Sequence, residues 1–198
     1  MNKSLTVLSL FSGTGSWTAY YPDSVHVFSI DSNPKFNATF GENILDWDYK
    51  YAFRYKIIDV IYASPPCNLY FTKLKQLTGS VVFNESDFEL SKKLVDKTLE
   101  IIEYLQPRFY IIENPVGKMR YMYPFIFHQE YHTLDYCMYG FPYRKPTDIW
   151  TNVNIEYKRC NHLKHNRIVK NNYSTVDRGR IPSELALMVM DTVKKEMM

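Results

Sequence analysis

Short apolar runs alternate along the chain with helical patterns, and this alternation restricts the fold more than any other feature. Four of the runs, rich in aliphatic residues, indicate buried strands at residues 5–10, 25–30, 57–63 and 109–112. Each run ends at a polar turn or at one that contains glycine or proline. The pattern predicts an α/β fold, with a mostly parallel sheet and helices on both of its faces. Ligands of such sheets bind at the carboxyl ends of the strands.

The longest predicted helix lies between the third and fourth strands. Residues 86–89, Ser-Asp-Phe-Glu, fit a capping box with Ser86 as the N-cap. Apolar residues then recur on one helical face until Pro107 ends the helix. Two further strands are expected at residues 134–139 and 148–153, and a last helix is expected to begin near Pro182.

Length and composition fit a single globular domain over residues 1–198. The chain is 45% hydrophobic and 23% charged, which is enough for one core without a disulfide or metal staple. No apolar run approaches the roughly 20 residues of a membrane span, and the apolar start at residues 5–11 is too short for a signal peptide. Three cysteines are too few for a disulfide framework, which favours a reducing, cytoplasmic compartment.

Positive charge is concentrated in one stretch of the sequence. Residues 151–180 contain seven Lys or Arg and two Asp or Glu, a net charge of +5, whereas the whole chain carries +3. Such a stretch forms either a solvated basic surface or a contact surface for a polyanion such as nucleic acid.

Two motifs after the first two strands indicate a nucleotide-like ligand. The first strand runs into Phe11-Ser12-Gly13-Thr14-Gly15, whose glycines let the backbone approach a ligand closely. Asp31 directly follows the second strand, where a carboxylate can bind the two hydroxyls of a ribose. The third glycine of a dinucleotide fingerprint and the lysine of a P-loop are both missing, which disfavours NAD and ATP. A simple tight turn is the alternative interpretation.

Two motifs after the third and fourth strands carry reactive groups. Pro65-Pro66 makes a rigid turn that presents Cys67, and Lys73 and Lys75 nearby favour its nucleophilic thiolate. Glu113-Asn114 ends a strand of apolar residues, an environment that suits a proton-donating carboxyl group. The alternatives are an inert small residue, as expected for Cys137 and Cys160, and an ordinary surface glutamate.

These motifs, in this order after successive strands, resemble those of the DNA cytosine-5 methyltransferases, and most closely the small phage- or virus-type members. The family has a Phe-x-Gly-x-Gly loop, a Pro-Cys nucleophile and a Glu-Asn pair. The resemblance covers about residues 5–151 and the last helix. It implies a Rossmann-like methyltransferase fold that uses S-adenosylmethionine as its cofactor.

The resemblance also implies roles for individual residues. Cys67 would attack C6 of a cytosine flipped out of its duplex, and Glu113 would hydrogen-bond the base at N3 and at the exocyclic amine. The positions that match cofactor-binding residues of the family are Phe11, Gly13, Thr14, Gly15, Asp31, Ser32, Asn43, Ile44 and Pro66.

On the substrate side, the resemblance implies roles for Asn114 and for residues 139–147. The latter resemble a family motif containing Gln-x-Arg-x-Arg, with Lys145 and Thr147 in place of the two arginines. Which of Arg144, Lys145 and Thr147 contacts the base stays open. Tyrosines around Tyr139 and Tyr143 are candidates for stacking on bases. Residues 152–179 stand where larger members carry a target-recognition domain, so we expect phosphate contacts there and a short or relaxed target sequence.

Several departures from the family pattern leave other functions open. Ser9 and Asn43 stand where the family usually has acidic residues, and the late Gly-Asn-Ser motif is missing. The alternatives are methylation of cytosine C5 in RNA such as tRNA, methylation of an exocyclic amine, and a catalytically inactive nucleic-acid-binding relative. Cys67 disfavours the exocyclic reaction, whose enzymes have an aromatic residue after Ser-Pro-Pro.

The expected partners follow from this interpretation. We expect DNA, or RNA in the alternative, as the macromolecular substrate of a monomer, with no membrane partner, in the cytoplasm of a microbe or of a virus-infected cell. Cys160, His162 and His165 form a poor zinc site because no second ligand pair accompanies them, so no metal is expected.

Overall fold

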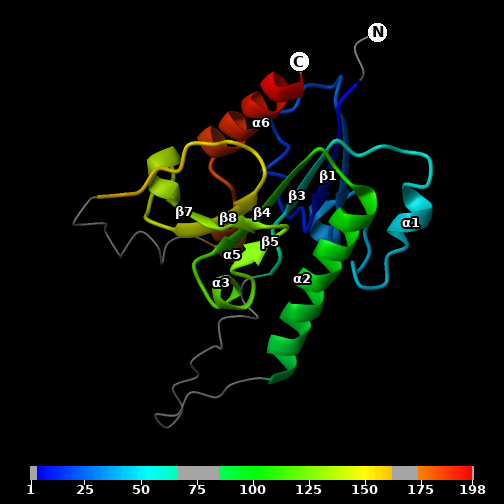
Figure 1. Cartoon of the computed structure of the whole chain (residues 1–198), viewed down its shortest axis with the longest axis horizontal. Helices are drawn as coiled ribbons and strands as arrows, with labels where there is room; N and C mark the ends of the chain where they lie inside the picture. Colours follow the sequence, from blue (N-terminus) through cyan, green and yellow to red (C-terminus); the bar gives the residue numbers. More distant parts are fainter. Residues whose placement is uncertain (1–3, 67–84, 162–173, 198) are drawn as a thin grey trace.

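The centre of the molecule is a six-stranded sheet in the order β2-β1-β3-β4-β8-β7 (Figure 1). The computed structural model describes residues 4–66, 85–161 and 174–197. The first four strands pair in parallel, whereas β8 is antiparallel to both of its neighbours. The mostly parallel sheet predicted from the sequence is therefore confirmed. The strands of this sheet, in chain order, are β1 (Thr6–Leu10), β2 (His26–Ile30), β3 (Val60–Ala63), β4 (Phe109–Pro115), β7 (His132–Asp135) and β8 (Pro146–Thr151).

Two long helices and several short elements complete the described part. The long helices are α2 (Glu85–Leu105) and α6 (Ser183–Met197). None of the helices in the described ranges is long and apolar enough to cross a membrane. The short elements are α1 (Tyr49–Ala52), α3 (Met119–Met122), α5 (Thr175–Gly179), the 3-10 helices η1 (Pro34–Phe36) and η3 (Tyr136–Tyr139), and a hairpin of β5 (Phe125–Ile126) and β6 (Gln129–Glu130).

The helices α2 and α6 cover opposite faces of the sheet, as Figure 1 shows. Alternate residues of β1 point to the two faces: Leu8 packs in the core beneath α2, and Val7 packs in the core beneath α6. Both cores also contain buried residues of the helices themselves, including Val95 from α2 and Val189 from α6. Burial on both faces explains why the strands are nearly continuous apolar runs.

Parallel pairing aligns the ends of the first four strands. Leu10 lies opposite both Ile30 and Ala63, and Ala63 in turn lies opposite Ile112. The residues that follow these positions, which contain the motifs singled out in the sequence, therefore emerge at one edge of the sheet.

The predicted strand over residues 134–139 is wrong in its second half. Pairing of β7 with β8 ends at Asp135, opposite Pro146, and the chain then turns into η3. The Asp135 N–H is directed away from β8, to the carbonyl of Lys158, and the Tyr136 N–H makes one more bond, to the carbonyl of Lys145, as η3 begins. Gly140 ends η3 with a φ of 82°, and a Cβ at this position would approach Glu184 Oε1 to 2.9 Å.

The boundaries of two other predicted elements shift. The helix α2 is already helical at Glu85, so Ser86 lies inside its first turn and is not the N-cap expected from the capping box. The strand expected over residues 57–63 is shorter, because pairing with β1 begins only near Val60.

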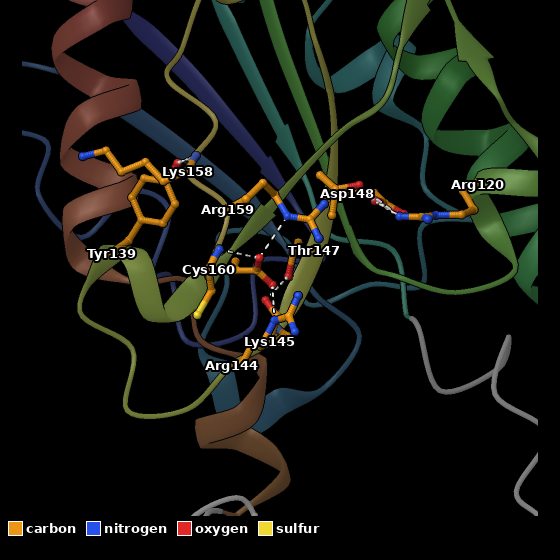
Figure 2. Close-up of polar contacts among 11 residues, drawn as sticks. Arg120, Tyr139, Arg144, Lys145, Thr147, Asp148, Lys158, Arg159 and Cys160 are labelled. Carbon is orange, nitrogen blue, oxygen red and sulfur yellow. Dashed lines mark hydrogen bonds and ion pairs between the residues drawn. The ribbon is translucent and has the colours of Figure 1, made fainter. Parts of the chain in front are cut away.

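A buried ion pair attaches α3 to the antiparallel part of the sheet. Arg120 donates from Nε and Nη2 to the two carboxylate oxygens of Asp148 in β8, and Figure 2 shows the two side chains pointing toward each other. Thr133 of β7 also donates to Asp148, at 2.8 Å. Asp148 is 1% exposed, so its charge depends on these donors.

We expect Arg120→Met to lower the free energy of unfolding by about 3–5 kcal/mol, because it leaves the buried carboxylate of Asp148 without its cation. Urea denaturation measures this. Lys97→Met is the matched control: Lys97 pairs with Glu100, whose side chain is 48% exposed and can be solvated without its partner, so this substitution should cost less than about 1 kcal/mol. Equal losses in the two variants would contradict a structural role for the buried pair.

Candidate active site

The loop after β1 turns sharply at the edge where the strands end. Three of its residues have positive φ angles: Phe11 at 54°, Gly13 at 51° and Gly15 at 70°. A left-handed conformation is ordinary for glycine but costs other residues on the order of 1 kcal/mol or more, and such residues concentrate at functional sites. Phe11 is thus held in an unfavourable conformation, and it lines the cavity described below.

Asp31 connects the end of β2 to this loop. Its Oδ2 accepts a hydrogen bond from the backbone N–H of Gly13 at 2.9 Å, and its Oδ1 accepts one from the N–H of Asn33 at 2.8 Å. These bonds orient the carboxylate, which remains partly exposed. The position that the sequence singled out for ribose binding therefore carries an oriented acid.

A cavity of about 350 Å³ opens beside Asp31. Six of the nine predicted cofactor-binding residues line it: Phe11, Asp31, Ser32, Asn43, Ile44 and Pro66. The other three, Gly13, Thr14 and Gly15, form the adjacent loop and are not part of the lining. Apolar walls with a carboxylate at one side match the chemistry of a nucleoside, whose base has flat faces that pack on apolar side chains and whose ribose presents two hydroxyls.

The sequence analysis missed four residues of the lining, Ile30, Glu42, Leu90 and Leu94. Leu90 and Leu94 come from α2, and nothing in their local sequence indicates a ligand. Glu42 had a signal, because it precedes Asn43, where the family usually has an acidic residue. The side-chain oxygen of Asn43 accepts a hydrogen bond from Leu45 N at 3.2 Å, whereas Glu42 supplies a carboxylate to the same wall.

Glu113 occupies a buried position in β4, which is separated by β1 and β3 from the strand that Asp31 follows. It is 4% exposed, and its Oε1 accepts a hydrogen bond from the hydroxyl of Tyr136 at 2.8 Å. The Nζ of Lys145 lies 3.8 Å from the same oxygen and also donates to the carbonyl of Arg178 at 3.1 Å. A phenol and an ammonium group thus satisfy one oxygen of this carboxylate. Tyr136 was missed in the sequence because its link to β4 is purely tertiary.

Asn114 ties the turn after β3 to β4. Its Nδ2 donates to the carbonyl oxygen of Pro65 at 2.9 Å, and the side chain is almost completely buried. The Pro65-Pro66 turn is therefore held against the strand that carries Glu113, and Pro66 forms part of the cavity wall. Cys67, the predicted nucleophile, follows Pro66 directly in the sequence and lies outside the described residues.

The three candidates for contact with a base are placed differently. Lys145 is the one that lies beside Glu113. Arg144, labelled in Figure 2, points instead to Asp135, to which its Nε donates at 3.0 Å. Thr147 is fully buried, and its hydroxyl donates to the carbonyl of Lys145 at 3.2 Å.

The expected stacking surface does not form at Tyr139 or Tyr143. Both rings are buried, at 2% and 5% exposure. The Tyr139 hydroxyl donates to the carbonyl of Glu156 at 2.6 Å and accepts from the N–H of Lys158 at 2.9 Å. Tyr139 therefore anchors the segment after β8, and neither tyrosine presents a face to a base.

No model of a known protein family matches the chain. Among solved structures, the fold is similar to that of Entamoeba histolytica methyltransferase EhMeth, with a TM-score of 0.52 and 16% identity over 83% of this chain and 61% of that one. A methyltransferase-type fold is thereby confirmed. A second solved structure, an E. coli prophage protein titled "putative DNA modification methyltransferase", matches 77% of this chain and 49% of its own at 19% identity and a TM-score of 0.49.

A viral protein provides the more informative comparison. The chain is 33% identical over 167 residues to the frog virus 3 (isolate Goorha) protein named "Probable DNA (cytosine-5)-methyltransferase", and the match covers 75% of this chain and 71% of the viral one. An identity of this level over most of both chains shows common descent, and it agrees with the fold and with the family resemblance of the motifs. The chain is a member of the DNA (cytosine-5)-methyltransferase family of enzymes.

Proposed function

We propose that the chain transfers a methyl group from S-adenosylmethionine to C5 of cytosine in DNA, and that residues 1–198 act as one catalytic domain. The hydrogen bond from Asn114 to Pro65 is the observation that carries this proposal, because it joins the Pro-Pro-Cys turn to the Glu-Asn strand. Pro66 then connects the same turn to the cavity. These contacts would bring a nucleophile, an acid and a cofactor site to one place.

The cavity fits the cofactor. Asp31, oriented by two backbone N–H groups, would bind the ribose hydroxyls, and Phe11, Ile44 and Pro66 would enclose the adenine. Ser32 and Asn43 lie in the same wall, and Gly13, Thr14 and Gly15 would keep the adjoining loop free of bulky side chains. When bound, S-adenosylmethionine supplies an electrophilic methyl group on a positively charged sulfur.

Cys67 and Glu113 would carry out the chemistry on a base flipped into the site. The Cys67 thiolate forms a bond to C6, and the electron pair of the C5–C6 double bond moves onto C5. The carboxyl O–H of Glu113 would donate to N3 and the exocyclic amine would donate to the same carboxyl group, which neutralises charge that develops on the ring. After C5 has received the methyl group, a base removes the C5 proton, the double bond re-forms, and the thiolate leaves.

Tyr136 and Lys145 would hold Glu113 in place for this contact. Both act on Oε1 of the carboxylate, which leaves Oε2 for the base. A positioned carboxylate is effective because no reorganisation is needed as charge develops. Tyr136 is in this view a positioning residue. Of Arg144, Lys145 and Thr147, Lys145 would lie nearest to the target base, because it is the one beside Glu113.

DNA is the substrate that we propose because the viral relative is named for it. The basic segment at residues 152–179 would contact phosphates, which position nucleic acid without reading its sequence. Incubation with isotope-labelled S-adenosylmethionine, separately with mixed-sequence DNA and with total RNA, tests this. Labelled 5-methyldeoxycytidine supports the proposal. Label on RNA cytosine or on an exocyclic amine, or on neither nucleic acid, overturns it.

We expect Cys67→Ser to abolish methyl transfer, since a serine hydroxyl is a far poorer nucleophile than a thiolate. Mass spectrometry of DNA digested to nucleosides measures the product. Cys137→Ser is the matched control, because burial and hydrogen bonding to Cys160 raise the pKa of the Cys137 thiol to about 11 and keep it protonated at neutral pH. Activity that survives in the Cys67 variant would exclude the covalent mechanism.

Asp31→Asn should weaken binding of S-adenosylmethionine about tenfold, because a hydrogen bond to a charged group contributes on the order of 1.5 kcal/mol. Isothermal titration calorimetry measures the affinity. The exposed Asp23 offers a control substitution, Asp23→Asn, with the same charge change away from the cavity. A thermal melt of both variants shows whether the loop after β1 has been disturbed. If Asp31→Asn binds S-adenosylmethionine with unchanged affinity, Asp31 does not bind the ribose.

Tyr136→Phe should lower kcat for methyl transfer about tenfold and leave KM for S-adenosylmethionine unchanged, because it removes a donor to Glu113 and nothing from the cavity. Tyr110→Phe is the control: its hydroxyl is also buried and donates to the carbonyl of Ile126 at 3.3 Å. Equal effects of the two substitutions on kcat would indicate a general loss of stability and not positioning of the acid.

A further inference from the structure

A buried carboxylate at the end of β7 orients two arginines from different segments. Asp135 is completely buried. Its Oδ1 accepts a hydrogen bond from Nε of Arg144 at 3.0 Å, and its Oδ2 accepts one from Nε of Arg159 at 2.9 Å. The backbone N–H of Cys160 also donates to Oδ2, at 2.8 Å. Figure 2 shows the Arg144 and Arg159 side chains converging on one place.

The charge of Asp135 is maintained by these contacts. Burial alone would raise the pKa of this carboxyl group, but the Cys160 N–H and the two guanidinium groups outweigh burial and lower it. The hydrogen bond to Asp135 and the negative charge of this carboxylate raise the pKa of Arg144. Asp135 and Arg144 are therefore both charged at neutral pH.

The way in which the arginines bind Asp135 leaves most of their donors available. A guanidinium group has five N–H donors, and each arginine uses only the one at Nε for this carboxylate. Arg144 is 41% exposed and Arg159 is 53% exposed. Within residues 4–66, 85–161 and 174–197, neither side chain has another acidic partner. The terminal nitrogens of both arginines are thus presented at the surface in fixed orientations.

Neutralisation of Asp135 does not explain the arrangement. One guanidinium group bound in the bidentate manner would satisfy both oxygens, as Arg120 does for Asp148. Here each oxygen binds a different arginine, so the three side chains together carry a net charge of +1 in addition to the donors. The neighbouring Lys158 does not add to this excess, because it pairs with Glu156 at 3.3 Å.

The arginine pair lies beside the candidate active site along two stretches of chain. Asp135 is followed by Tyr136, whose hydroxyl binds Glu113, and Arg144 is followed by Lys145, whose Nζ lies 3.8 Å from the same carboxylate. In both stretches, one residue is directed to the arginine pair and the next to Glu113. The backbone of both stretches therefore links the arginine pair to the groups that surround Glu113.

We propose that Arg144 and Arg159, oriented by Asp135, bind a phosphate of the nucleic-acid backbone next to the target base. The two free oxygens of a phosphodiester match the planar array of donors on a guanidinium group. Because Asp135 orients both guanidinium groups before a ligand binds, little side-chain entropy is lost on binding. The contact carries no sequence information. This inference rests on the proposed function for its nucleic-acid ligand, and it adds a defined phosphate site.

The test compares Arg144→Gln and Arg159→Gln with the wild-type chain in binding a short mixed-sequence DNA duplex over a series of salt concentrations. Each loss of a phosphate contact should weaken binding about fivefold at a fixed salt concentration and flatten the slope of log K against log salt by about 0.9. Arg54→Gln is the matched control: Arg54 is exposed and follows α1, which lies on the opposite side of the molecule from β7 (Figure 1).

Asp135→Asn separates orientation from charge. This substitution makes the chain more positive, so a purely electrostatic surface would bind DNA more tightly. A site that depends on two oriented arginines should instead bind DNA about fivefold more weakly, because an amide has only one acceptor oxygen and cannot hold both. A thermal melt shows whether the variant is folded; if it is not, the two arginine variants decide the question alone.

The outcomes distinguish this site from the proposed function. Arginine variants that bind DNA like Arg54→Gln overturn the phosphate site, even when the chain methylates DNA. A wild-type chain that fails to bind the duplex also overturns it for DNA, and the same series with single-stranded RNA shows whether RNA supplies the phosphate. If the arginine variants bind DNA more weakly and with a flatter salt slope, but the wild-type chain methylates no cytosine, the phosphate site is supported and the proposed enzymatic function is refuted.

Discussion

Parallel pairing of β2, β1, β3 and β4 is the constraint on which the rest of the molecule depends. The register places Leu10, Ile30, Ala63 and Ile112 in one row across the sheet, so each following turn leaves the sheet at the same edge. The glycine loop, Asp31 and the Pro-Pro turn are distant in sequence and are brought together by this alignment. Burial by α2 on one face and α6 on the other fixes the register, because a slip of one residue would exchange the two cores.

Buried carboxylates attach the antiparallel part of the sheet to the segments around it. Asp148 of β8 binds Arg120 and Thr133, and Asp135 of β7 binds Arg144 and Arg159. Each would cost several kcal/mol if it lost its donors. The segments that reach Glu113 and the surface arginines are therefore held by charge and hydrogen bonds as well as by apolar packing.

Under the proposed function, the two parts of the sheet have different roles in the enzyme. The parallel strands supply the cofactor cavity and the reactive motifs, while β7, β8 and their connection supply the groups that surround the acid. The arginine pair would hold the nucleic-acid backbone close to the reacting base. A contact of this kind is independent of sequence, which agrees with a chain that has only a short segment in place of a target-recognition domain.

The sequence alone determined the sheet and the identity of the motifs, because apolar periodicity and turn residues are local signals. It predicted six of the cavity residues through their places after successive strands. Only the tertiary structure decided which side chains meet: that Tyr136 binds Glu113, that Lys145 and not Arg144 lies beside it, that Tyr139 and Tyr143 are buried, and that Glu42 enters the cavity. These contacts join residues from separate elements, and their geometry is set by packing, which no local pattern records.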